Sequence, residues 1–174
     1  GRHAEAGEAL DDAYARWPRD PWVRRQAAHR ALSRADWEAL AEILPPAEVF
    51  PGSPDSAILH AFRGRLLAER GDLAGARRDA EDAARLRGGD AWVRLHAGMA
   101  MDAAGDRPAA RAHWESGLHA LPASGGTRWL RVRLLTELAR LAEREGREGD
   151  ALRTWREIAE IDPGNAEAAA RAGR

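Results

Sequence analysis

The sequence contains no cysteine and no lysine, and it has no long apolar run. Without cysteine, disulfide bonds and thiolate chemistry are excluded, while the redox compartment stays open. A membrane-spanning helix needs about 20 consecutive apolar residues, and no stretch of the sequence approaches that length. All 27 basic residues are arginines, which we attribute to the base composition of the source.

The sequence also lacks an excess of positive or negative charge. The formal net charge is −1, so the chain has no overall attraction to nucleic acid or to an anionic membrane. The seven tryptophans outnumber one tyrosine and two phenylalanines, but a base-stacking surface would also need a basic stripe, which we do not find. We therefore expect a soluble segment with no nucleic-acid partner and no membrane span. Cytoplasmic and periplasmic locations both stay open.

Alanine supplies much of the apolar content, and the spacing of apolar residues is helical throughout. In the segment 56–70, for example, Ile58, Phe62 and Leu66 recur one turn apart. Polar capping residues precede such segments and glycine or proline follows them. The predicted N-caps are Asp36, Asp55, Asp72, Asp90, Asp106, Thr127 and Asn165. No segment has the alternation of a strand, so the predicted fold class is all-α.

The hexapeptide GDLAGA at 71–76 returns as GDRPAA at 105–110, 34 residues later. We interpret each as the turn inside a two-helix unit, and the interval as the length of that unit. The sequence predicts one domain over 1–174 with helix pairs at 22–44, 56–87, 91–121 and 128–161, a helix at 5–16 and a helical stub at 166–172. Because the chain begins without methionine and ends in that stub, we expect a piece of a longer protein.

Small residues recur 12 positions apart, one in each helix of a predicted pair. They are Gly64 and Ala76, Gly98 and Ala110, and Ala139 and Ala151. Trp114 and Trp155 follow the second members by four residues, on the same helix face. We expect these eight residues to form the contacts within the pairs, because small side chains allow close helix approach.

This pattern resembles the tetratricopeptide repeat (TPR) family. The unit from Ala91 matches the family at each key position, whereas the units from Ala57 and Val132 depart at some of them. The full match consists of Gly98, Ala110, Trp114, Gly117 and Pro122. The resemblance implies an α-solenoid, a right-handed superhelix of stacked antiparallel helix pairs. It also implies a non-enzymatic scaffold that binds a partner protein or peptide in its concave groove.

The resemblance further places certain first-helix positions on the groove wall. The candidates are Arg24, Arg65, Trp92, Leu95, Met99, Arg133 and Arg140. Such a wall would suit a segment with an apolar anchor and acidic neighbours. In the alternative interpretation, Trp92 and Met99 pack on neighbouring helices while the arginines pair with Glu137 and Glu143. Both interpretations stay open.

Motifs for catalysis and cofactor binding are missing. There is no nucleophile elbow and no phosphate-binding glycine pattern. Glu115 and His119 lie one turn apart but lack a third metal ligand. The chain has no lysine for a dicarboxylate clamp of the kind used by chaperone-binding relatives. We expect no enzymatic activity, no cofactor and no metal.

Two alternative functions remain open. The chain could associate with itself, forming a homo-oligomer through its terminal helices. It could instead be the regulatory TPR segment of a larger enzyme, or part of a bacterial envelope or secretion assembly protein.

Overall fold

The computed structural model describes residues 2–122 and 126–173, with side chains from residue 5 onward. Over these residues the regular structure is helical and contains no strand. The elements are α1 (Arg2–Arg16), α2 (Pro21–Ser33), α3 (Trp37–Ile43), a 3₁₀ turn η1 (Pro54–Ser56), α4 (Ala57–Glu69), α5 (Leu73–Leu86), α6 (Ala91–Ala103), α7 (Arg107–Ala120), α8 (Arg128–Arg144), α9 (Glu148–Ile161) and α10 (Ala166–Ala172). None of these helices has the length and apolar character to cross a bilayer.

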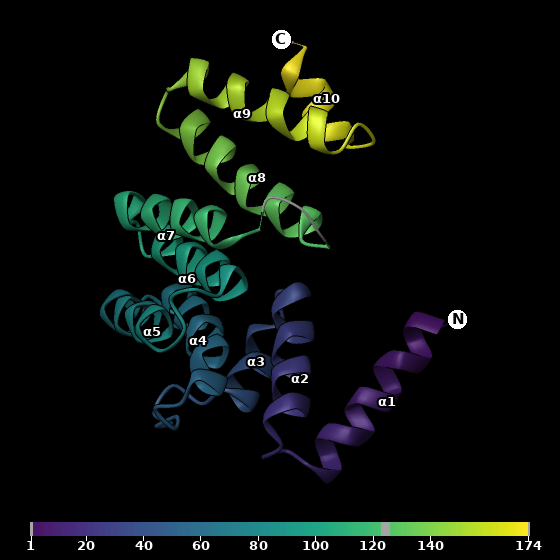
Figure 1. Cartoon of the computed structure of the whole chain (residues 1–174). Coiled ribbons are helices and arrows are strands. Elements are labelled where there is room, and N and C mark those ends of the chain that lie inside the picture. The colour runs from purple at the N-terminus through teal and green to yellow at the C-terminus, as the bar shows by residue number, and fades with distance from the viewer. Residues whose placement is uncertain (1, 123–125, 174) are drawn as a thin grey trace.

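Consecutive helices pack as antiparallel pairs, and the pairs stack on one another (Figure 1). The pairs are α2/α3, α4/α5, α6/α7 and α8/α9, with α10 packed on α9. The first helix of one pair also packs on the first helix of the next, as α4 does on α6. The prediction of an all-α solenoid is confirmed. At the N-terminal end, α1 packs on α2 and projects from the stack.

The same turn joins the two helices of every pair. Gly71, Gly105 and Gly146 have φ angles of 82°, 78° and 69°, a left-handed conformation that glycine adopts without steric penalty. The residue after the glycine starts the next helix, and Asp72 accepts a hydrogen bond from Gly75 N at 2.8 Å. In the first pair this position is Ala35, with φ 53°. The repeated hexapeptide therefore encodes a turn. At Ala35 the Cβ atom makes the same left-handed backbone conformation unfavourable.

One of the predicted N-caps is wrong, and one takes the predicted position without making the capping hydrogen bond. Asp55 does not cap α4, because Pro54–Ser56 forms a 3₁₀ turn and Ser56 takes the N-cap position. The Ser56 hydroxyl donates to Ser53 O at 2.8 Å, so it closes the preceding loop and does not cap the helix. Thr127 stands at the N-cap of α8 but its side chain makes no capping hydrogen bond. The other predicted caps accept a helix N–H, and Asp20, which was not predicted, accepts one from Val23 N at 2.9 Å.

The eight residues expected between the paired helices are all buried: Gly64, Ala76, Gly98, Ala110, Trp114, Ala139, Ala151 and Trp155. At Gly98 an ideal Cβ would lie 2.3 Å from Trp114 Nε1, so only a glycine leaves room for the indole. The indole N–H donates to Leu95 O at 3.1 Å. The Trp155 indole bonds instead to Glu143 Oε1, at 3.0 Å.

The third and fourth pairs differ in length. Helix α8 has 17 residues, whereas α4 and α6 have 13 each. The first helix of the fourth pair is therefore four residues longer than those of the second and third pairs. Residues 123–125, between α7 and α8, lie outside the described residues.

Candidate partner-binding hollow

A hollow of about 660 Å³ runs along the first helices of the pairs. We call it the inner hollow. Its lining residues are His29, Leu32, Ser33, Arg65, Trp92, Leu95, His96, Met99, Trp129, Val132, Arg133, Thr136, Arg140, Asn165 and Glu167. Each belongs to α2, α4, α6, α8 or α10, counting Asn165 as the N-cap of α10. The stacking of pairs thus brings side chains from five helices to one concave surface.

Six of the seven groove candidates line the inner hollow, and Arg24 does not. The Arg24 guanidinium donates to Ile43 O at 2.7 and 3.0 Å and to Glu48 Oε1 at 2.7 Å. The expected placement of Arg24 is therefore wrong. Because α3 is short, Ile43 and the following proline-rich loop approach the start of α2 and bind this side chain.

The apolar part of the hollow is a cluster of rings around Trp92. The Trp92 ring centroid lies 5.3 Å from that of Trp129, 5.4 Å from His29 and 4.4 Å from His96, all edge-on. Trp129 is 58% exposed. Edge-to-face contacts of this kind hold the rings in place while leaving one indole open to a ligand.

The candidates differ in how much surface they offer. Leu95 is 1% exposed and belongs to the core formed mainly by α6, α7 and α8. Trp92 and Met99 are half-buried, with part of each side chain in the core and part facing the hollow. In α6, Leu95 thus packs in the core, whereas Trp92 and Met99 each contribute both to the core and to the surface of the hollow.

Two of the three lining arginines form ion pairs. Arg133 Nη2 lies 3.1 Å from Glu137 Oε1, and Arg140 Nη2 donates to Glu167 Oε2 at 2.7 Å. The first pair agrees with the expected pairing along α8. The second does not, because α10 brings Glu167 to Arg140. Glu143 instead accepts from Arg171 Nη1 at 2.7 Å.

Arg65 has no such partner. Among the described residues it makes neither a hydrogen bond nor an ion pair, although it is partly buried in the stack. Burial lowers its pKa, and Glu137 opposes this from beyond ion-pair distance. Arginine nevertheless stays protonated in proteins. The hollow thus contains one guanidinium whose charge is uncompensated by contact.

The two histidines of the hollow are neutral at neutral pH. Burial, and then the charges of Arg65, His29 and Arg133, hold the pKa of His96 well below its usual range. His96 is 5% exposed, and both of its ring nitrogens lack a hydrogen-bond partner within the part of the chain described. Burial followed by the Arg25 charge also lowers the pKa of His29. The positive charge of the hollow therefore comes from its arginines.

Sequence reasoning missed part of the lining, above all Trp129. The signal was present, because Trp129, Arg133, Thr136 and Arg140 recur every three or four residues along α8. The repeat frame began at Val132 and so left Trp129 outside the unit. His29 and Glu167 depend on how α2 and α10 approach α6 and α8, which no local pattern indicates.

A second polar cluster lies between α4 and α5, outside the hollow. Asp79 is 4% exposed and accepts from Arg63 Nε and Nη2 at 2.6 and 2.8 Å, while His60 Nδ1 lies 2.9 Å away. Burial raises the pKa of Asp79, but the bonds from Arg63 and His60 outweigh this and lower it. His60, Asp79 and Asp82 are close enough for a metal ion, yet Arg63 already occupies both Asp79 oxygens. The cluster is suited to joining the two helices.

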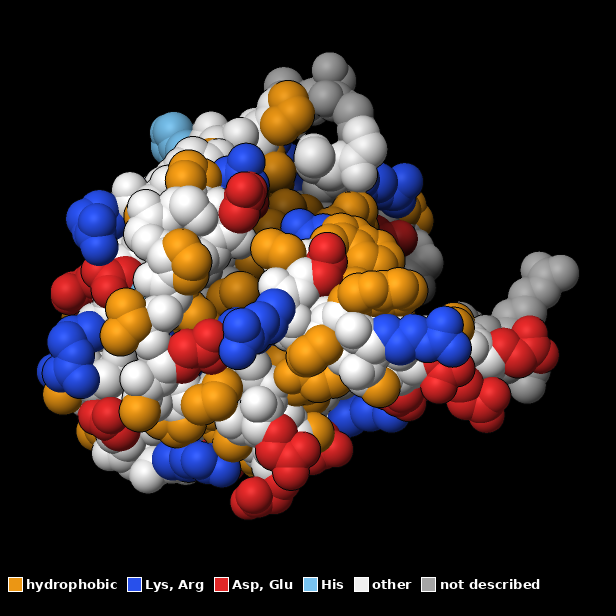
Figure 2. All heavy atoms as spheres, turned by 90° about the horizontal axis from the view of Figure 1, so that it is seen from below, with side chains coloured by type: hydrophobic (Ala, Val, Ile, Leu, Met, Phe, Trp, Pro, Cys, Tyr) orange, Lys and Arg blue, Asp and Glu red, His pale blue; other side chains and the backbone are white. Residues whose placement is uncertain are grey.

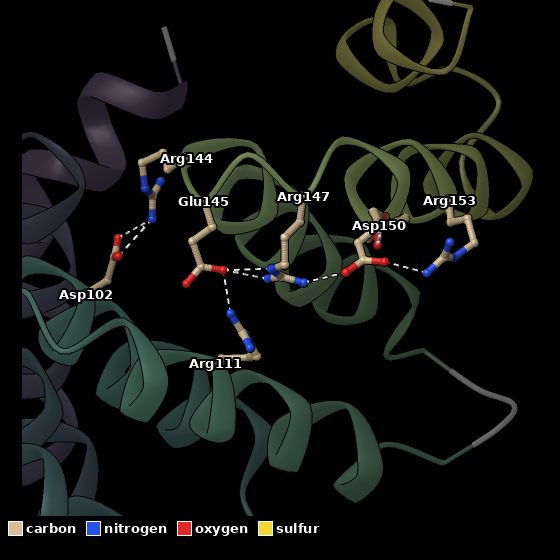
Figure 3. Close-up of polar contacts among 8 residues, drawn as sticks. Asp102, Arg111, Arg144, Glu145, Arg147, Asp150 and Arg153 are labelled. Carbon is tan, nitrogen blue, oxygen red and sulfur yellow. Dashed lines mark hydrogen bonds and ion pairs between the residues drawn. The ribbon is translucent and has the colours of Figure 1, made fainter.

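Charged contacts also connect the third and fourth pairs (Figure 3). Arg144 on α8 donates to Asp102 on α6 at 2.7 Å, and Arg111 on α7 bonds to Glu145 in the α8–α9 turn. Arg147 donates to the same Glu145 carboxylate at 2.7 Å. These bonds, with Arg147 first and Arg111 after it, lower the pKa of Glu145. The contacts join α8 to α6 and the α8–α9 turn to α7.

One comparison with known proteins gives a match. No protein-family model matches the chain, and no curated protein matches it. Among solved structures, the chain is similar to the crystal structure of a thermophilic TPR protein from Thermus thermophilus, with a TM-score of 0.69 and 20% sequence identity. The similarity covers 94% of this chain and 85% of that one. At this identity the likeness shows the fold alone, and the fold is that of TPR proteins.

Proposed function

We propose that the chain is a non-enzymatic scaffold whose inner hollow holds a segment of a partner protein. The observation that carries the proposal is the convergence of five helices, the first helix of each pair and α10, on one concave surface with an exposed indole. TPR-type stacks are suited to protein interaction in general, because the repeats create an extended concave surface. The volume of about 660 Å³ lies within the range of ligand sites in proteins.

Trp129 is the residue expected to contribute most to binding. Tryptophan is enriched among the residues that dominate protein interfaces, and a buried indole removes about 150–250 Å² from water. Trp92 supports Trp129 edge-on, so the exposed ring is already held in position. A partner would therefore bind without ordering that side chain first.

The polar groups of the hollow are arranged for binding and not for catalysis. The Ser33 hydroxyl donates to His29 O at 2.8 Å, and the Thr136 hydroxyl donates to Val132 O at 2.8 Å. Each hydroxyl is thus bonded to its own helix backbone. Within the described lining, neither hydroxyl is hydrogen-bonded to a histidine or carboxylate that could act as its general base.

Two tryptophan variants with matched exposure test the proposal. Trp129 is 58% exposed and lines the hollow, whereas Trp22 is 60% exposed and lies outside it on α2. Proteins captured by the immobilised chain from an extract of the source organism are compared for wild type, Trp129→Ala and Trp22→Ala. We expect a specific protein that is lost with Trp129→Ala and retained with Trp22→Ala. Retention by both variants would overturn the proposal.

Self-association is distinguished by a separate measurement. Light scattering across a range of concentrations gives the mass of the wild-type chain in the absence of any partner. A scaffold that binds through the hollow keeps a constant mass. A mass that rises with concentration, and falls back with Trp129→Ala, would assign the hollow to a second copy of the chain instead.

A further inference from the structure

Arg65 differs from Arg63, its neighbour on α4, and from Arg133 and Arg140, the other arginines that line the hollow. Arg63, two residues earlier on α4, shows how the chain stabilises a buried guanidinium, because both oxygens of Asp79 bind it. Arg133 and Arg140 each have a carboxylate within 3.1 Å. Arg65 has none among the described residues. The Arg65 side chain is half-buried and its nitrogens keep some contact with solvent, so its donors can bind an anion that enters the hollow.

A second unpartnered group lies in the same hollow. His96 is almost fully buried, lines the hollow with Arg65, and has no hydrogen-bond partner for either nitrogen within the described residues. Buried polar atoms are nearly always hydrogen-bonded, so the two unpaired His96 nitrogens, beside the unpaired and partly exposed Arg65 guanidinium, indicate a ligand. Beside them, the Trp92 and Trp129 rings offer an apolar surface. The hollow thus has one anion-binding position next to an aromatic one.

We infer that Arg65 binds the side-chain carboxylate of an aspartate or glutamate in the partner segment, whose neighbouring apolar residue packs on Trp92 and Trp129. This inference rests on the proposed function and specifies the chemistry of the partner. The guanidinium can donate two parallel hydrogen bonds to a carboxylate, which a single ammonium group cannot match. A phosphate would be matched less well, because its charge of about −2 would need more than one unpaired arginine.

The place of Arg65 in the hollow favours a carboxylate within the segment over one at its end. The lining extends from His29 on α2 to Glu167 on α10, and Arg65 on α4 lies between these limits. A segment that places an acidic side chain at Arg65 can continue in both directions along the lining. A C-terminal carboxylate at Arg65 would leave one side of the hollow empty.

The test uses random peptides of about 12 residues displayed on phage and selected on the full chain, a length that spans the hollow when extended. In one library the peptide C-terminus is fused to the coat protein, and in a second it is free. Peptides that lose binding to Trp129→Ala are kept as hollow binders. Their dissociation constants are then measured by fluorescence anisotropy for wild type, Arg65→Gln, Arg65→Lys and Arg78→Gln. Arg78 is an exposed α5 residue whose replacement gives the same change in net charge.

We expect hollow binders from the fused library to share an acidic residue next to an apolar one. Arg65→Gln should weaken them roughly tenfold to hundredfold, Arg65→Lys less, and Arg78→Gln not at all. A peptide with glutamine or asparagine in place of its acidic residue should bind the wild-type chain more weakly by the same factor. Its affinity for Arg65→Gln should be no weaker than its affinity for wild type. If Arg65→Gln does not fold, the substituted peptide still tests the inference on the wild-type chain.

Three results would overturn the inference, and they differ from a failure of the proposed function. Hollow binders without an acidic residue, or with affinities that Arg65→Gln leaves unchanged, would refute the role of Arg65 alone. Hollow binders found only in the library with free C-termini would assign the position to a terminal carboxylate. If no selected peptide depends on Trp129, the proposed function itself fails.

Discussion

Replacing Gly98 with alanine should destabilise the chain, although alanine is the better helix former. An ideal Cβ at residue 98 would lie 2.3 Å from Nε1 and 2.6 Å from Cδ1 of Trp114. The indole is fully buried, so it cannot move aside into solvent. Any movement would also break the hydrogen bond from Nε1 to Leu95 O.

The magnitude follows from three contributions. Forcing an extra methyl group into a packed core costs about 1–3 kcal/mol. Leaving the buried indole N–H unpaired costs about 1–3 kcal/mol more. Replacing glycine by alanine within a helix returns about 1 kcal/mol. We therefore expect the free energy of unfolding to fall by about 1–5 kcal/mol, with a central value of about 3 kcal/mol.

The assay is urea unfolding followed by far-UV circular dichroism, with Gly149→Ala as the control. Gly149 lies on the exposed side of α9, and a Cβ there would meet only the end of the Arg153 side chain at 3.9 Å. The control should thus be as stable as wild type or slightly more stable, because residue 149 lies in the first turn of α9 and gains less than the roughly 1 kcal/mol of a helix interior. A Gly98→Ala variant as stable as wild type would refute the close-packing argument. If the double variant Gly98→Ala/Trp114→Phe is more stable than Gly98→Ala, the loss of stability is due to the clash with the indole.

Three further predictions concern stability. Burial, and then the Arg94 charge, lowers the pKa of His113 to about 4. Since unfolded histidine has a pKa of about 6.5, the unfolded state binds more protons between these values, and stability decreases as the pH is lowered through that window. The loss from this site should be about 2 kcal/mol between about pH 7 and 5, measured by urea unfolding, and absent in His113→Gln. Ala35→Gly should raise stability by roughly 0.5–1 kcal/mol in the same assay, because it relieves the left-handed φ of 53°. Arg63→Met should lower stability by about 3 kcal/mol or more, since it leaves the Asp79 carboxylate buried without its main partner, and a melting temperature equal to wild type would contradict this.

Much of the fold could be predicted because its signals are local. The turn at Gly105 and the cap at Asp106 lie within a few residues of each other, and each has a direct backbone cause. The same reasoning was wrong at Asp55, where a proline-containing 3₁₀ turn begins before the helix. It also missed that Ala35 adopts the glycine conformation, because alanine does not favour a left-handed φ, although Asp36 follows Ala35 as Asp72 follows Gly71.

The hollow could be predicted only in part. Positions on one helix, such as Trp92 and Met99 on α6, follow from helical periodicity and the repeat frame. Ion pairs between side chains of different helices and loops do not follow from that periodicity. The loop carboxylate of Glu48 takes Arg24 away from the groove, and α10 supplies Glu167 to Arg140. The lack of a partner for Arg65 depends on all the neighbouring helices together.

Helix α6 separates folding from binding on two of its faces. Gly98 contacts Trp114 on the side toward α7, where a change alters the core. Trp92, His96 and Met99 recur at four and three residues and face the hollow. Changes at exposed or unpartnered hollow residues, such as Trp129 and Arg65, should therefore leave stability nearly unchanged while they alter binding. Loss of binding in those variants with intact helical content would thus report on the site, whereas loss of binding in Gly98→Ala would report on the scaffold.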